Sequence, residues 1–444
     1  MIVSKRVIFK DQIYEALSDD TREIAEGVLL VKTPSNARFI PPNTPCLEAQ
    51  ELGRYFDLSI PIIGITGTNG KTTTATLISF LLQALGHSCA LLGTRGFFIK
   101  GTQVKPKGLT TPSLLELYGD IERASSEGVE YFVMEVSSHA IAQERILGLE
   151  FAAKVHTNIT SDHLDYHGDL ETYRAIKNQF LSDESLKIIN LDDPHVRFNP
   201  TNAYGYACER KTHLSVNAYS LQPEISAHVE FHADPRTRRN PNSSAEMGIV
   251  HAPLMGLHNL YNLLGALLCV RALTKKPLET LCPLFSDFPG VEGRMEVVHQ
   301  SPLVVVDFAH TADGFVQIFN SFKAQKIKVV FGAGGDRDKS KRPLMGQVAT
   351  THALKSYITS DNPRTEDPLA IIKDILSGIA PELRARAMVE PDRKKAIELA
   401  LSELQDDEVL LILGKGDECV QIVGETHLPF DDRALVRNFF KEQV

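Results

Sequence analysis

Short apolar runs alternate with amphipathic segments along most of the chain, and this pattern predicts an α/β protein. The runs at residues 62–65, 131–134 and 152–155 are continuous, as expected for strands that are buried on both faces of a parallel sheet. Polar residues follow each run at once, where the carboxyl ends of parallel strands form binding sites. A second series at residues 303–308, 329–331, 356–359 and 409–413 alternates with helical segments and predicts a further doubly wound sheet.

The chain of 444 residues is too long for one hydrophobic core. Before residue 60, short apolar segments such as 28–31 are interrupted by prolines at 34, 41, 42 and 45, which indicates a small α/β module. We therefore predict three domains, at residues 1–60, 61–295 and 296–444, the last of them Rossmann-like. Within the second, residues 231–244 are polar and predict a surface loop or hairpin, and residues 254–273 predict a mostly buried helix.

Charge and composition argue against several classes of protein. The net charge of -9, from 56 acidic and 47 basic residues, argues against a nucleic-acid binder. No apolar run reaches the roughly 18 residues of a membrane span, and the N-terminus lacks a signal-peptide pattern. The six cysteines form no C-x-x-C pair, so we expect buried, reduced thiols and neither a zinc site nor a disulfide framework. We expect a cytoplasmic protein that contacts neither nucleic acid nor membrane.

A glycine-rich turn follows the first of these apolar runs and leads into a helical pattern. The residues are Gly67, Thr68, Asn69, Gly70, Lys71, Thr72 and Thr73. The spacing of these residues departs by one position from the general phosphate-loop pattern G-x-x-x-x-G-K-[ST], but the physical reasons for that pattern still apply. Small residues let backbone N–H groups approach phosphate oxygens, Lys71 supplies positive charge near the outer phosphates, and Thr72 offers a hydroxyl to Mg²⁺. The alternative is an ordinary glycine turn before a helix.

Two more polar side chains come directly after predicted strands. Glu135 ends one run, and His163 follows another. A carboxylate and an imidazole can bind a divalent cation, and Mg²⁺ is favoured beside a nucleotide. Taken alone, each is more often a satisfied polar group than a ligand.

Ordered strings along the chain carry a family resemblance. They are GTNGKTT (67–73), TTP (110–112), EVSSH (135–139), TNITSDHLDYHG (157–168), Tyr173 with Lys177, GLHNLYN (256–262), GVEGRME (290–296), DFAHTADG (307–314), GGDRDKSKRPLMG (334–346), DNPR (361–364) and GKGDE (414–418). In this order the set resembles the bacterial Mur ligases, which add amino acids to the UDP-linked muramoyl peptide of cell-wall synthesis. The resemblance implies a monomeric ligase with a uridine-binding N-terminal domain, a central ATP-binding domain and a C-terminal amino-acid-binding domain.

The resemblance also implies how ATP and Mg²⁺ are used. ATP phosphorylates a substrate carboxylate, and an amine then displaces phosphate from the acyl phosphate. Besides residues 67–73, the nucleotide is expected to meet Asn262, Arg294 and Asp307, with His310 a less certain contact. The implied metal ligands are Thr72, Glu135, His163 and Lys177.

Lys177 carries the most informative implication. In similar ligases this lysine is carbamylated by CO₂ and becomes an anion that helps to hold a second Mg²⁺. The Tyr173–Lys177 spacing places both residues on one helix face. The alternative is an exposed helical lysine, the usual environment of lysine. The catalytic set implied by the resemblance is Lys71, Glu135, His163 and Lys177.

The two remaining substrates are also assigned by resemblance. The acceptor, UDP-N-acetylmuramoyl-L-alanyl-D-glutamate, is expected to contact Thr110, Thr111, Ser137, Gln143 and Arg145. Its uridine end is expected near Thr21, where similar ligases have a serine, and a second loop would fall at residues 35–37, which are Ser35, Asn36 and Ala37.

The amino acid that is added is implied to be meso-diaminopimelate. DNPR resembles the string of ligases that use this substrate, whereas lysine-adding relatives lack its arginine. Arg364 can pair with the second carboxylate that lysine does not have, and a site built around such a pair can reject lysine by a factor on the order of 10⁴. The implied contacts are Arg337, Asp361, Asn362, Pro363, Arg364, Gly414 and Glu418. Asp417 stands where the family often has histidine.

Three other interpretations stay open at this point. Folylpolyglutamate synthetase shares the loop and the metal site but needs neither DNPR nor a uridine-binding module. A nucleotide-gated switch or motor would turn over ATP without a carboxylate acceptor. A scaffold without activity is disfavoured by the presence of Lys71, Glu135, His163 and Lys177.

Overall fold

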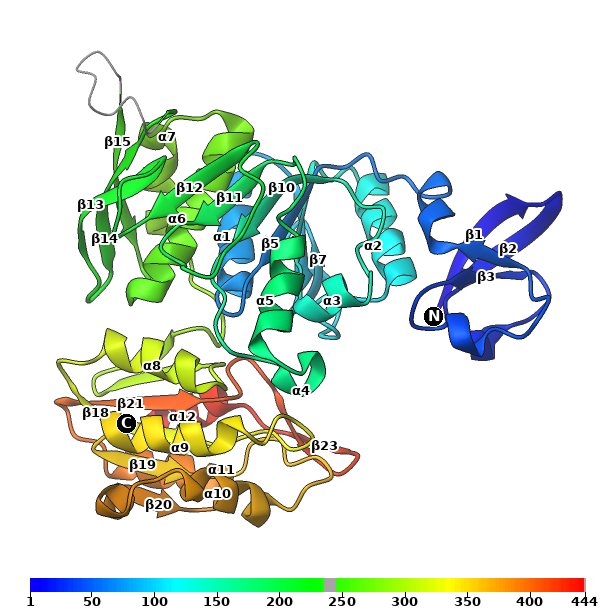
Figure 1. Cartoon of the computed structure of the whole chain (residues 1–444). Helices are drawn as coiled ribbons and strands as arrows, with labels where there is room; N and C mark the ends of the chain where they lie inside the picture. The colour runs from blue at the N-terminus through cyan, green and yellow to red at the C-terminus, as the bar shows by residue number, and fades with distance from the viewer. Residues whose placement is uncertain (235–244, 443–444) are drawn as a thin grey trace.

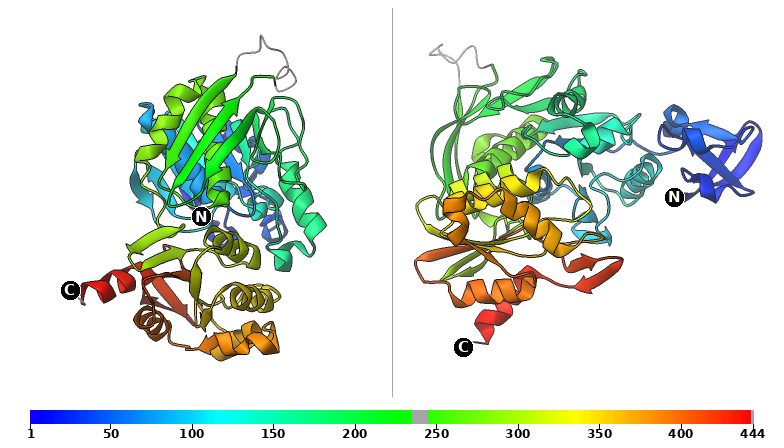
Figure 2. Two further views of the ribbon diagram at one scale, coloured as in Figure 1. Left: turned by 90° about the vertical axis from the view of Figure 1, so that its left-hand side faces the viewer. Right: turned by 60° about the horizontal axis from the view of Figure 1, so that its bottom comes forward.

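The computed structural model describes residues 1–234 and 245–442 and arranges them around three large sheets (Figures 1 and 2). The sheets follow one another along the chain, and the expected α/β architecture with N-terminal, middle and C-terminal domains is confirmed. Within the described ranges, no helix is long and apolar enough to cross a membrane.

The N-terminal sheet has four strands in the order β1-β2-β3-β4. They are β1 (Ile2–Phe9), β2 (Gln12–Ser18), β3 (Val28–Lys32) and β4 (Cys46–Glu48). The helical part of the expected module consists of three short 3-10 helices: η1 (Thr21–Glu23), η2 (Ala37–Phe39) and η3 (Ala49–Arg54). Prolines between β3 and β4 leave too few consecutive N–H donors for a longer helix.

The middle sheet has eleven strands in the order β15-β14-β13-β12-β11-β10-β5-β9-β6-β7-β8. They are β5 (Ile62–Thr66), β6 (Cys89–Gly93), β7 (Gly96–Ile99), β8 (Thr102–Lys105), β9 (Tyr131–Glu135), β10 (Phe151–His156), β11 (Lys187–Asn190), β12 (Ala203–Ala207), β13 (Leu214–Ser220), β14 (Ile225–Phe231) and β15 (Glu246–Ala252). In this spatial order, the neighbouring strands from β13 through β5 to β6 all pair in parallel. The pairs at the two edges, β13–β14 and β14–β15 on one side and β6–β7 and β7–β8 on the other, are antiparallel. Of the predicted loop at 231–244, Phe231 ends β14, and residues 235–244 lie outside the described residues.

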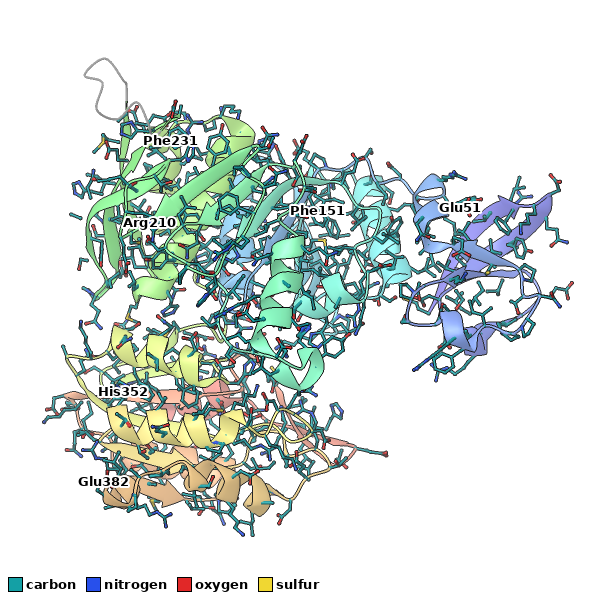
Figure 3. The ribbon with its side chains drawn as sticks, viewed as in Figure 1. Glu51, Phe151, Arg210, Phe231, His352 and Glu382 are labelled. Carbon is teal, nitrogen blue, oxygen red and sulfur yellow. The ribbon has the colours of Figure 1, made fainter. Side chains whose placement is uncertain are left out.

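Helices cover both faces of the middle sheet. They are α1 (Lys71–Ala84), α2 (Leu114–Ser126), α3 (Ser138–Ala142), α4 (Leu164–His167), α5 (Leu170–Gln179), α6 (Leu257–Thr274), α7 (Leu278–Leu281) and the 3-10 helix η5 (Cys282–Asp287). The predicted buried helix is α6, and it packs with α1 in one hydrophobic core. On the other face, Phe151 packs edge-to-face on Phe180, with ring centroids 5.0 Å apart (Figure 3).

The C-terminal sheet has six strands in the order β16-β17-β21-β18-β19-β20. They are β16 (Glu296–Gln300), β17 (Leu303–Asp307), β18 (Lys326–Phe331), β19 (Lys355–Ile358), β20 (Ala387–Val389) and β21 (Glu408–Leu413). All but the edge strand β16 run parallel, as the second series of apolar runs predicted.

The C-terminal sheet carries a hydrophobic core on each face. Its helices are α8 (Ala312–Ser321), α9 (Lys341–His352), α10 (Pro368–Ser377), η6 (Pro381–Arg386), α11 (Arg393–Ser402) and α12 (Asp432–Lys441), and β22 (Val420–Val423) pairs with β23 (Thr426–Pro429) beside them. In Figure 1 this domain lies below the middle domain, and the N-terminal sheet lies to the right.

One prediction about the cysteines is wrong. Cys89, Cys269 and Cys282 are buried as expected, whereas Cys419 is exposed and Cys46 and Cys208 are partly exposed. Cys419 lies just before β22, whose partner strand β23 is exposed along its whole length. All six are free thiols.

Candidate active site

The glycine-rich turn joins β5 to α1, in the strand–turn–helix context that a phosphate loop requires. Gly67 and Gly70 have φ values of 154° and 86°, and a Cβ at either would lie within 2.2 Å of a neighbouring side-chain oxygen. The ammonium of Lys71 donates to the carbonyls of Gly67 (2.9 Å) and Thr68 (3.0 Å), inside the turn. Burial lowers the pKa of Lys71, and the nearby carboxylate of Glu135 raises it. The turn is thus tight, basic and lined by backbone.

Glu135, at the end of β9, lies beside the start of α1. The hydroxyl of Thr72 donates to Glu135 Oε1 (3.0 Å), and so does the backbone N–H of Thr94 (2.9 Å). The Thr94 hydroxyl donates to Oε2 (3.2 Å) and lies 3.3 Å from the hydroxyl of Thr110. Glu135 is buried, and these three hydrogen bonds from Thr72 and Thr94 keep it fixed next to the phosphate loop.

Lys177 and Tyr173 lie on α5 with the spacing that places both on one helix face, and both side chains are buried. Only 1% of Lys177 is exposed, which excludes the interpretation of an ordinary solvent-facing lysine. Its Nζ donates to the carbonyl of Gly67 (2.8 Å), and the Tyr173 hydroxyl lies 2.9 Å from Thr68 Oγ1. Burial places the pKa of Lys177 well below its usual value, and the positive charge of Lys71 lowers it further. Both effects increase the share of neutral amine at this position.

His163 precedes α4, has a φ of 54°, and lines the same cavity as Lys71 and Thr72. Partial burial lowers the pKa of His163 to about 4, although neighbouring Asp162 raises it, so the ring is neutral near pH 7. His163 Nε2 lies 3.4 Å from Asp162 Oδ2. A neutral imidazole is the form that can coordinate a metal ion.

The predicted metal ligands are arranged as an open set. Thr72 and Glu135 touch, and Glu135 and His163 line one cavity, whereas Lys177 lies behind the turn at the Gly67 carbonyl. Among residues 1–234 and 245–442, no three His, Cys, Asp or Glu side chains converge as a metal cage. Oxygen donors of this sparse kind fit Mg²⁺, which keeps several waters and substrate phosphates as ligands.

A cavity of about 120 Å³ lies beside the turn, between the middle and C-terminal domains. It brings together all the residues that sequence assigned to ATP outside positions 67–73, and it is lined among others by Asn69, Gly70, Thr73, Asn262, Arg294, Asp307 and His310. The Arg294 guanidinium lies 4.1 Å from the Phe308 ring centroid, and its Nε is buried without a hydrogen-bond partner in the described structure. Such an unsatisfied donor in a cavity wall fits a polar ligand.

A second cavity, of about 430 Å³, continues from the turn towards the C-terminal domain. Six residues of the phosphate loop, Thr110 from the residues expected to hold the acceptor, and two residues expected to hold the amino acid line it. Its wall includes Thr68, Lys71, Thr72, Thr94, Lys107, Thr110, Glu135, Asp162, His163, Arg337 and Glu418. The geometry therefore places three predicted substrate regions around one space.

The other residues assigned to the acceptor gather at α3. Thr111 Oγ1 donates to the Glu135 carbonyl (2.9 Å), and the Ser137 backbone N–H donates to Thr111 Oγ1 (3.1 Å). Arg145 donates to the Thr111 carbonyl (2.7 Å) and to the side-chain oxygen of Gln143 (2.6 Å). This places a guanidinium next to the acceptor residues at the mouth of the active site.

The uridine-side residues lie apart, in the N-terminal sheet. Thr21 begins η1. The side chain of Asn36 donates to the carbonyls of Asp19 (2.9 Å) and Val31 (2.8 Å), and these hydrogen bonds fix its loop against β3 and the end of β2. Ser35 Oγ lies 2.9 Å from Thr33 Oγ1, and Ala37 begins η2. In the part of the chain that the structure describes, no hydrogen bond or ion pair joins Thr21 to the acceptor residues at α3.

The DNPR and GKGDE segments meet at the carboxyl ends of β19 and β21. Asn362 donates to Glu418 Oε2 (2.8 Å), Asn362 N–H donates to Asp361 Oδ1 (2.7 Å), and Gly414 follows β21 directly. Arg364, which follows Pro363, donates to the Gly335 carbonyl (2.8 Å). Burial lowers the pKa of Arg364, and the adjacent Arg337 guanidinium lowers it further. Within residues 1–234 and 245–442, neither arginine has a carboxylate within ion-pair distance.

Several residues of this region were missed by the sequence interpretation. Lys415 is fully buried and donates to Asn362 Oδ1 (3.0 Å) and Glu418 Oε2 (3.1 Å), so it holds the two predicted ligands together. Asp162 and Lys415 lie within the quoted strings and could have been found there. Thr94 lies in the turn between β6 and β7, where no motif marked it.

Comparison with known proteins identifies related chains. Residues 65–270 match the family described as "Mur ligase middle domain", and residues 293–416 match "Mur ligase, glutamate ligase domain". A UDP-N-acetylmuramoyl-L-alanyl-D-glutamate–2,6-diaminopimelate ligase of Helicobacter pylori is 53% identical over an alignment of 447 positions that covers 99% of each chain. A solved structure of a ligase with this name is 30% identical with a TM-score of 0.65, and the match covers 97% of this chain and 96% of that one.

A folylpolyglutamate synthase of Mycobacterium tuberculosis, solved with ADP and AMPPCP, has a TM-score of 0.63 at 17% identity over 82% of this chain and 91% of that one, a likeness of fold alone. The two matched family regions contain the phosphate loop, the Lys177 helix and the Arg337–Arg364 pair, and the Helicobacter relative matches along nearly the whole length. The chain therefore belongs to the Mur ligase family.

Proposed function

We propose that this protein catalyses the ATP-dependent addition of meso-diaminopimelate to UDP-N-acetylmuramoyl-L-alanyl-D-glutamate in the cytoplasmic synthesis of peptidoglycan precursors. The name of the relative that is 53% identical supports this assignment. The structural observation that carries it is the pair Arg337 and Arg364, two adjacent guanidiniums without carboxylate partners in the described chain. Guanidiniums without carboxylate partners, Arg364 partly buried and Arg337 exposed, fit the anionic groups of an incoming substrate.

The proposed reaction has two steps. A carboxylate oxygen of the acceptor attacks the γ-phosphorus of ATP, the bond to the β-phosphate oxygen breaks, and ADP leaves. The amine nitrogen of meso-diaminopimelate then attacks the acyl carbon, phosphate leaves with the bonding electrons, and the nitrogen loses a proton. Both steps bring anions together, so they need the positive charge of Lys71 and oriented donors.

We assign ATP to residues 67–73 and to the cavity with Asn262, Arg294 and Asp307. The backbone of the turn would cradle the phosphates, and the carboxylate of Asp307, fixed by the backbone N–H groups of Met295 (2.7 Å) and Ala309 (2.6 Å), would accept from the ribose. Bound Mg²⁺ would neutralise charge that develops on the transferring phosphate. Thr72, Glu135 and His163 are the residues we assign to hold it.

We assign Lys177 as a carbamylated residue. Its neutral Nζ would form an N–C bond with CO₂ and release a proton, which leaves a carbamate anion. The low pKa of the buried amine supports this step, because only the neutral amine is nucleophilic. The carbamate would supply the second carboxylate-like ligand that the open metal set lacks.

We assign the acceptor to Thr110, Thr111, Ser137, Gln143 and Arg145, with its uridine end near Thr21. Meso-diaminopimelate would place its distal carboxylate on Arg364 and its distal ammonium on Glu418 and the Gly414 carbonyl. Arg337 would hold the carboxylate beside the attacking amine, and Asp361, Asn362 and Pro363 would shape the pocket. We place the three domains at residues 1–60, 61–295 and 296–444 and expect a monomer.

One assay tests the proposed function. ADP release is measured with UDP-N-acetylmuramoyl-L-alanyl-D-glutamate and, in separate reactions, with lysine, with meso-diaminopimelate, and with a folate plus glutamate as the control for the folylpolyglutamate alternative. We expect rapid turnover with meso-diaminopimelate alone. Equal turnover with lysine would overturn the substrate assignment, and turnover without any acceptor would favour a simple ATPase.

A further inference from the structure

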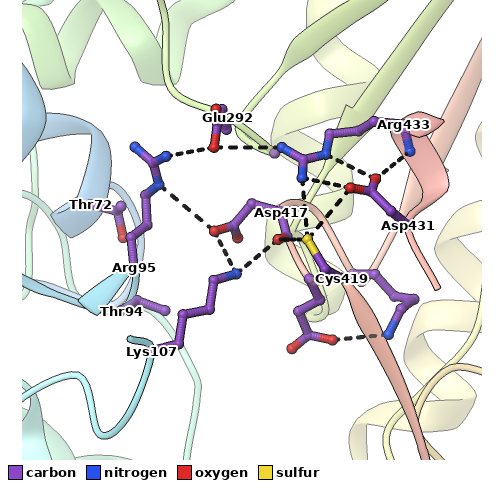
Figure 4. A network of polar contacts seen from close by, with 12 residues as sticks. Thr72, Thr94, Arg95, Lys107, Glu292, Asp417, Cys419, Asp431 and Arg433 are labelled. Carbon is purple, nitrogen blue, oxygen red and sulfur yellow. Dashed lines mark hydrogen bonds and ion pairs between the residues drawn. The ribbon is translucent and has the colours of Figure 1, made fainter. Parts of the chain in front are cut away.

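We propose that Asp417 is a positioning residue that holds the loop carrying the acceptor against the turn carrying the incoming amino acid. This inference rests on the proposed function for its substrates. Figure 4 shows Arg95 and Lys107 of the middle domain extending towards Asp417 of the C-terminal domain. We call Arg95, Lys107, Glu292, Asp417 and Arg433 the interdomain latch.

The contacts of the latch cross the domain boundary twice. Lys107 Nζ lies 2.5 Å from Asp417 Oδ2 and donates to the Asp417 carbonyl at 2.9 Å, while Arg95 Nε lies 3.7 Å from the same carboxylate oxygen. On the other side, Arg95 Nη2 donates to Glu292 (2.7 Å), and Arg433 Nη1 lies 3.7 Å from Glu292 Oε2. Arg95 and Lys107 of the middle domain therefore hold Asp417 of the C-terminal domain, and Glu292 joins Arg95 to Arg433.

Because Asp417 is buried, its ion pairs are expected to contribute more free energy than exposed ion pairs do. Exposed ion pairs contribute little, but only 4% of the Asp417 side chain is exposed. Its second oxygen, Oδ1, is buried without a hydrogen-bond partner among the described residues, so the charge depends on Lys107 and Arg95 for compensation. Removing a partner of such a buried charge is costly, because the other charge stays desolvated and unpaired.

The latch joins the two segments that must meet in the reaction. Lys107 precedes Thr110 and Thr111, the residues assigned to the acceptor, and Asp417 precedes Glu418, which is assigned to the amino acid. Lys107, Thr110 and Glu418 line the same cavity as the phosphate loop. A shift of about 1 Å between reacting groups can cost on the order of 100-fold in rate, so a fixed link between these segments affects catalysis directly.

The turn that carries Asp417 also packs on Gly293, near the end of the middle domain. A Cβ at Gly293 would lie 2.0 Å from the Asp417 backbone nitrogen, so the two backbones are in close contact. A histidine at position 417 could not replace the carboxylate here. Its protonated form would face Lys107 and Arg95 with like charge, and its neutral form would leave Lys107 without this carboxylate and Arg95 with Glu292 alone.

The kinetic test compares Asp417→Asn, Lys107→Met and the double variant with the wild type. We expect each single variant to lower kcat/KM for meso-diaminopimelate by about 10-fold or more. If the two residues act through one contact, the double variant falls no further than the worse single variant, within about 2-fold. Asp417→Glu, which keeps the charge, should retain more activity than Asp417→Asn.

The matched control is Asp407→Asn. Asp407 pairs with Lys326 in the same domain, but both side chains are more than half exposed. This variant should match the wild type in every measurement. Asp417→Asn kinetics equal to those of the wild type would overturn the proposal, and so would effects of Asp417→Asn and Lys107→Met that multiply independently, because they would show no coupling.

A second measurement does not depend on activity. Hydrogen exchange of the full chain with ATP and Mg²⁺ reports the opening of local contacts. In Asp417→Asn we expect faster exchange both at residues 106–111 and at residues 414–418, and no change in Asp407→Asn. Faster exchange confined to residues 414–418 would overturn the latch. If the wild type failed to use meso-diaminopimelate, the proposed function would fail, and the exchange result would still decide whether Asp417 holds the two segments together.

Discussion

Lys177 shows what a single position can and cannot reveal. The Y-x-x-x-K spacing placed it on a helix face with Tyr173, and a family resemblance marked it for modification. Its burial could not be predicted, because it results from packing against the carbonyl of Gly67, 110 positions away. The low pKa follows from that packing, so the chemistry of the residue is a tertiary property.

Lys177→Ala should lower the rate of ADP release by about 100-fold or more, because the site loses an anion that orients the transferring phosphate. Short carboxylic acids such as acetate should restore part of the activity, since they can occupy the space of the carbamate. Lys187→Ala is the control: Lys187 is equally buried but donates to the carbonyls of Asp183 and Ser185. Near-wild-type turnover of Lys177→Ala, or no rescue by acids, would contradict the assignment.

Arg364→Lys should lower kcat/KM for meso-diaminopimelate by about 100-fold, because an ammonium cannot form the paired hydrogen bonds of a guanidinium. The KM for ATP should stay within about 2-fold, since the nucleotide cavity does not include this residue. Steady-state kinetics with each substrate varied in turn provide the test. Arg384→Lys, at an exposed position of η6, is the control, and unchanged kinetics in Arg364→Lys would refute its role.

At the scale of elements, continuous apolar runs located the buried strands well. The run at 131–134 became β9 (Tyr131–Glu135), and the run at 409–413 became β21 (Glu408–Leu413). The hairpin strands β6, β7 and β8 carried no comparable signal, so Thr94 and Arg95 escaped notice. The order of strands also could not be predicted, because β5 pairs with β9 and β10, which are far away in sequence.

The phosphate loop gives a prediction at this scale. Gly70→Ala should abolish measurable ATP binding, because its Cβ would lie 2.2 Å from Asn262 Oδ1 at a φ of 86°. Gly86→Ala, just after α1, has a similar φ of 92° and open space, so it should cost only about 1–2 kcal/mol of stability. Nucleotide titration and thermal unfolding separate the two effects. Equal ATP affinity in both variants would show that the close approach of Gly70 to Asn262 is not needed for ATP binding.

For the whole molecule, partly buried histidines predict sensitivity to acid. Burial lowers the pKa of His139, His163 and His258 to about 4, from 6.5. Between these values the unfolded chain binds more protons than the folded one, so stability falls as the pH drops from 6.5 towards 4 and changes little above 7. For His258 the loss between pH 7 and pH 5 amounts to as much as about 2 kcal/mol.

Thermal unfolding at pH 7 and pH 5 measures this loss. The variant His258→Gln should show a smaller drop in Tm over this range than the wild type, because glutamine does not titrate. His228→Gln, at an exposed position of β14, is the control and should show the wild-type drop. A drop in Tm for His258→Gln as large as that of the wild type would contradict the assignment.

The N-terminal sheet does not have a core of its own. Leu17, Leu29 and Leu47 of its strands lie in one cluster with Leu115 and Tyr118 of α2, which belongs to the middle sheet. Ring packing of Phe56 on Tyr118, with centroids 5.6 Å apart, ties the two further. On our assignments, the uridine end and the peptide end of the acceptor then rest on a single body. The distance between the uridine-side residues and the phosphate loop is therefore fixed. A nucleotide-linked peptide that is one residue too short or too long would put its carboxylate out of reach of the phosphate loop.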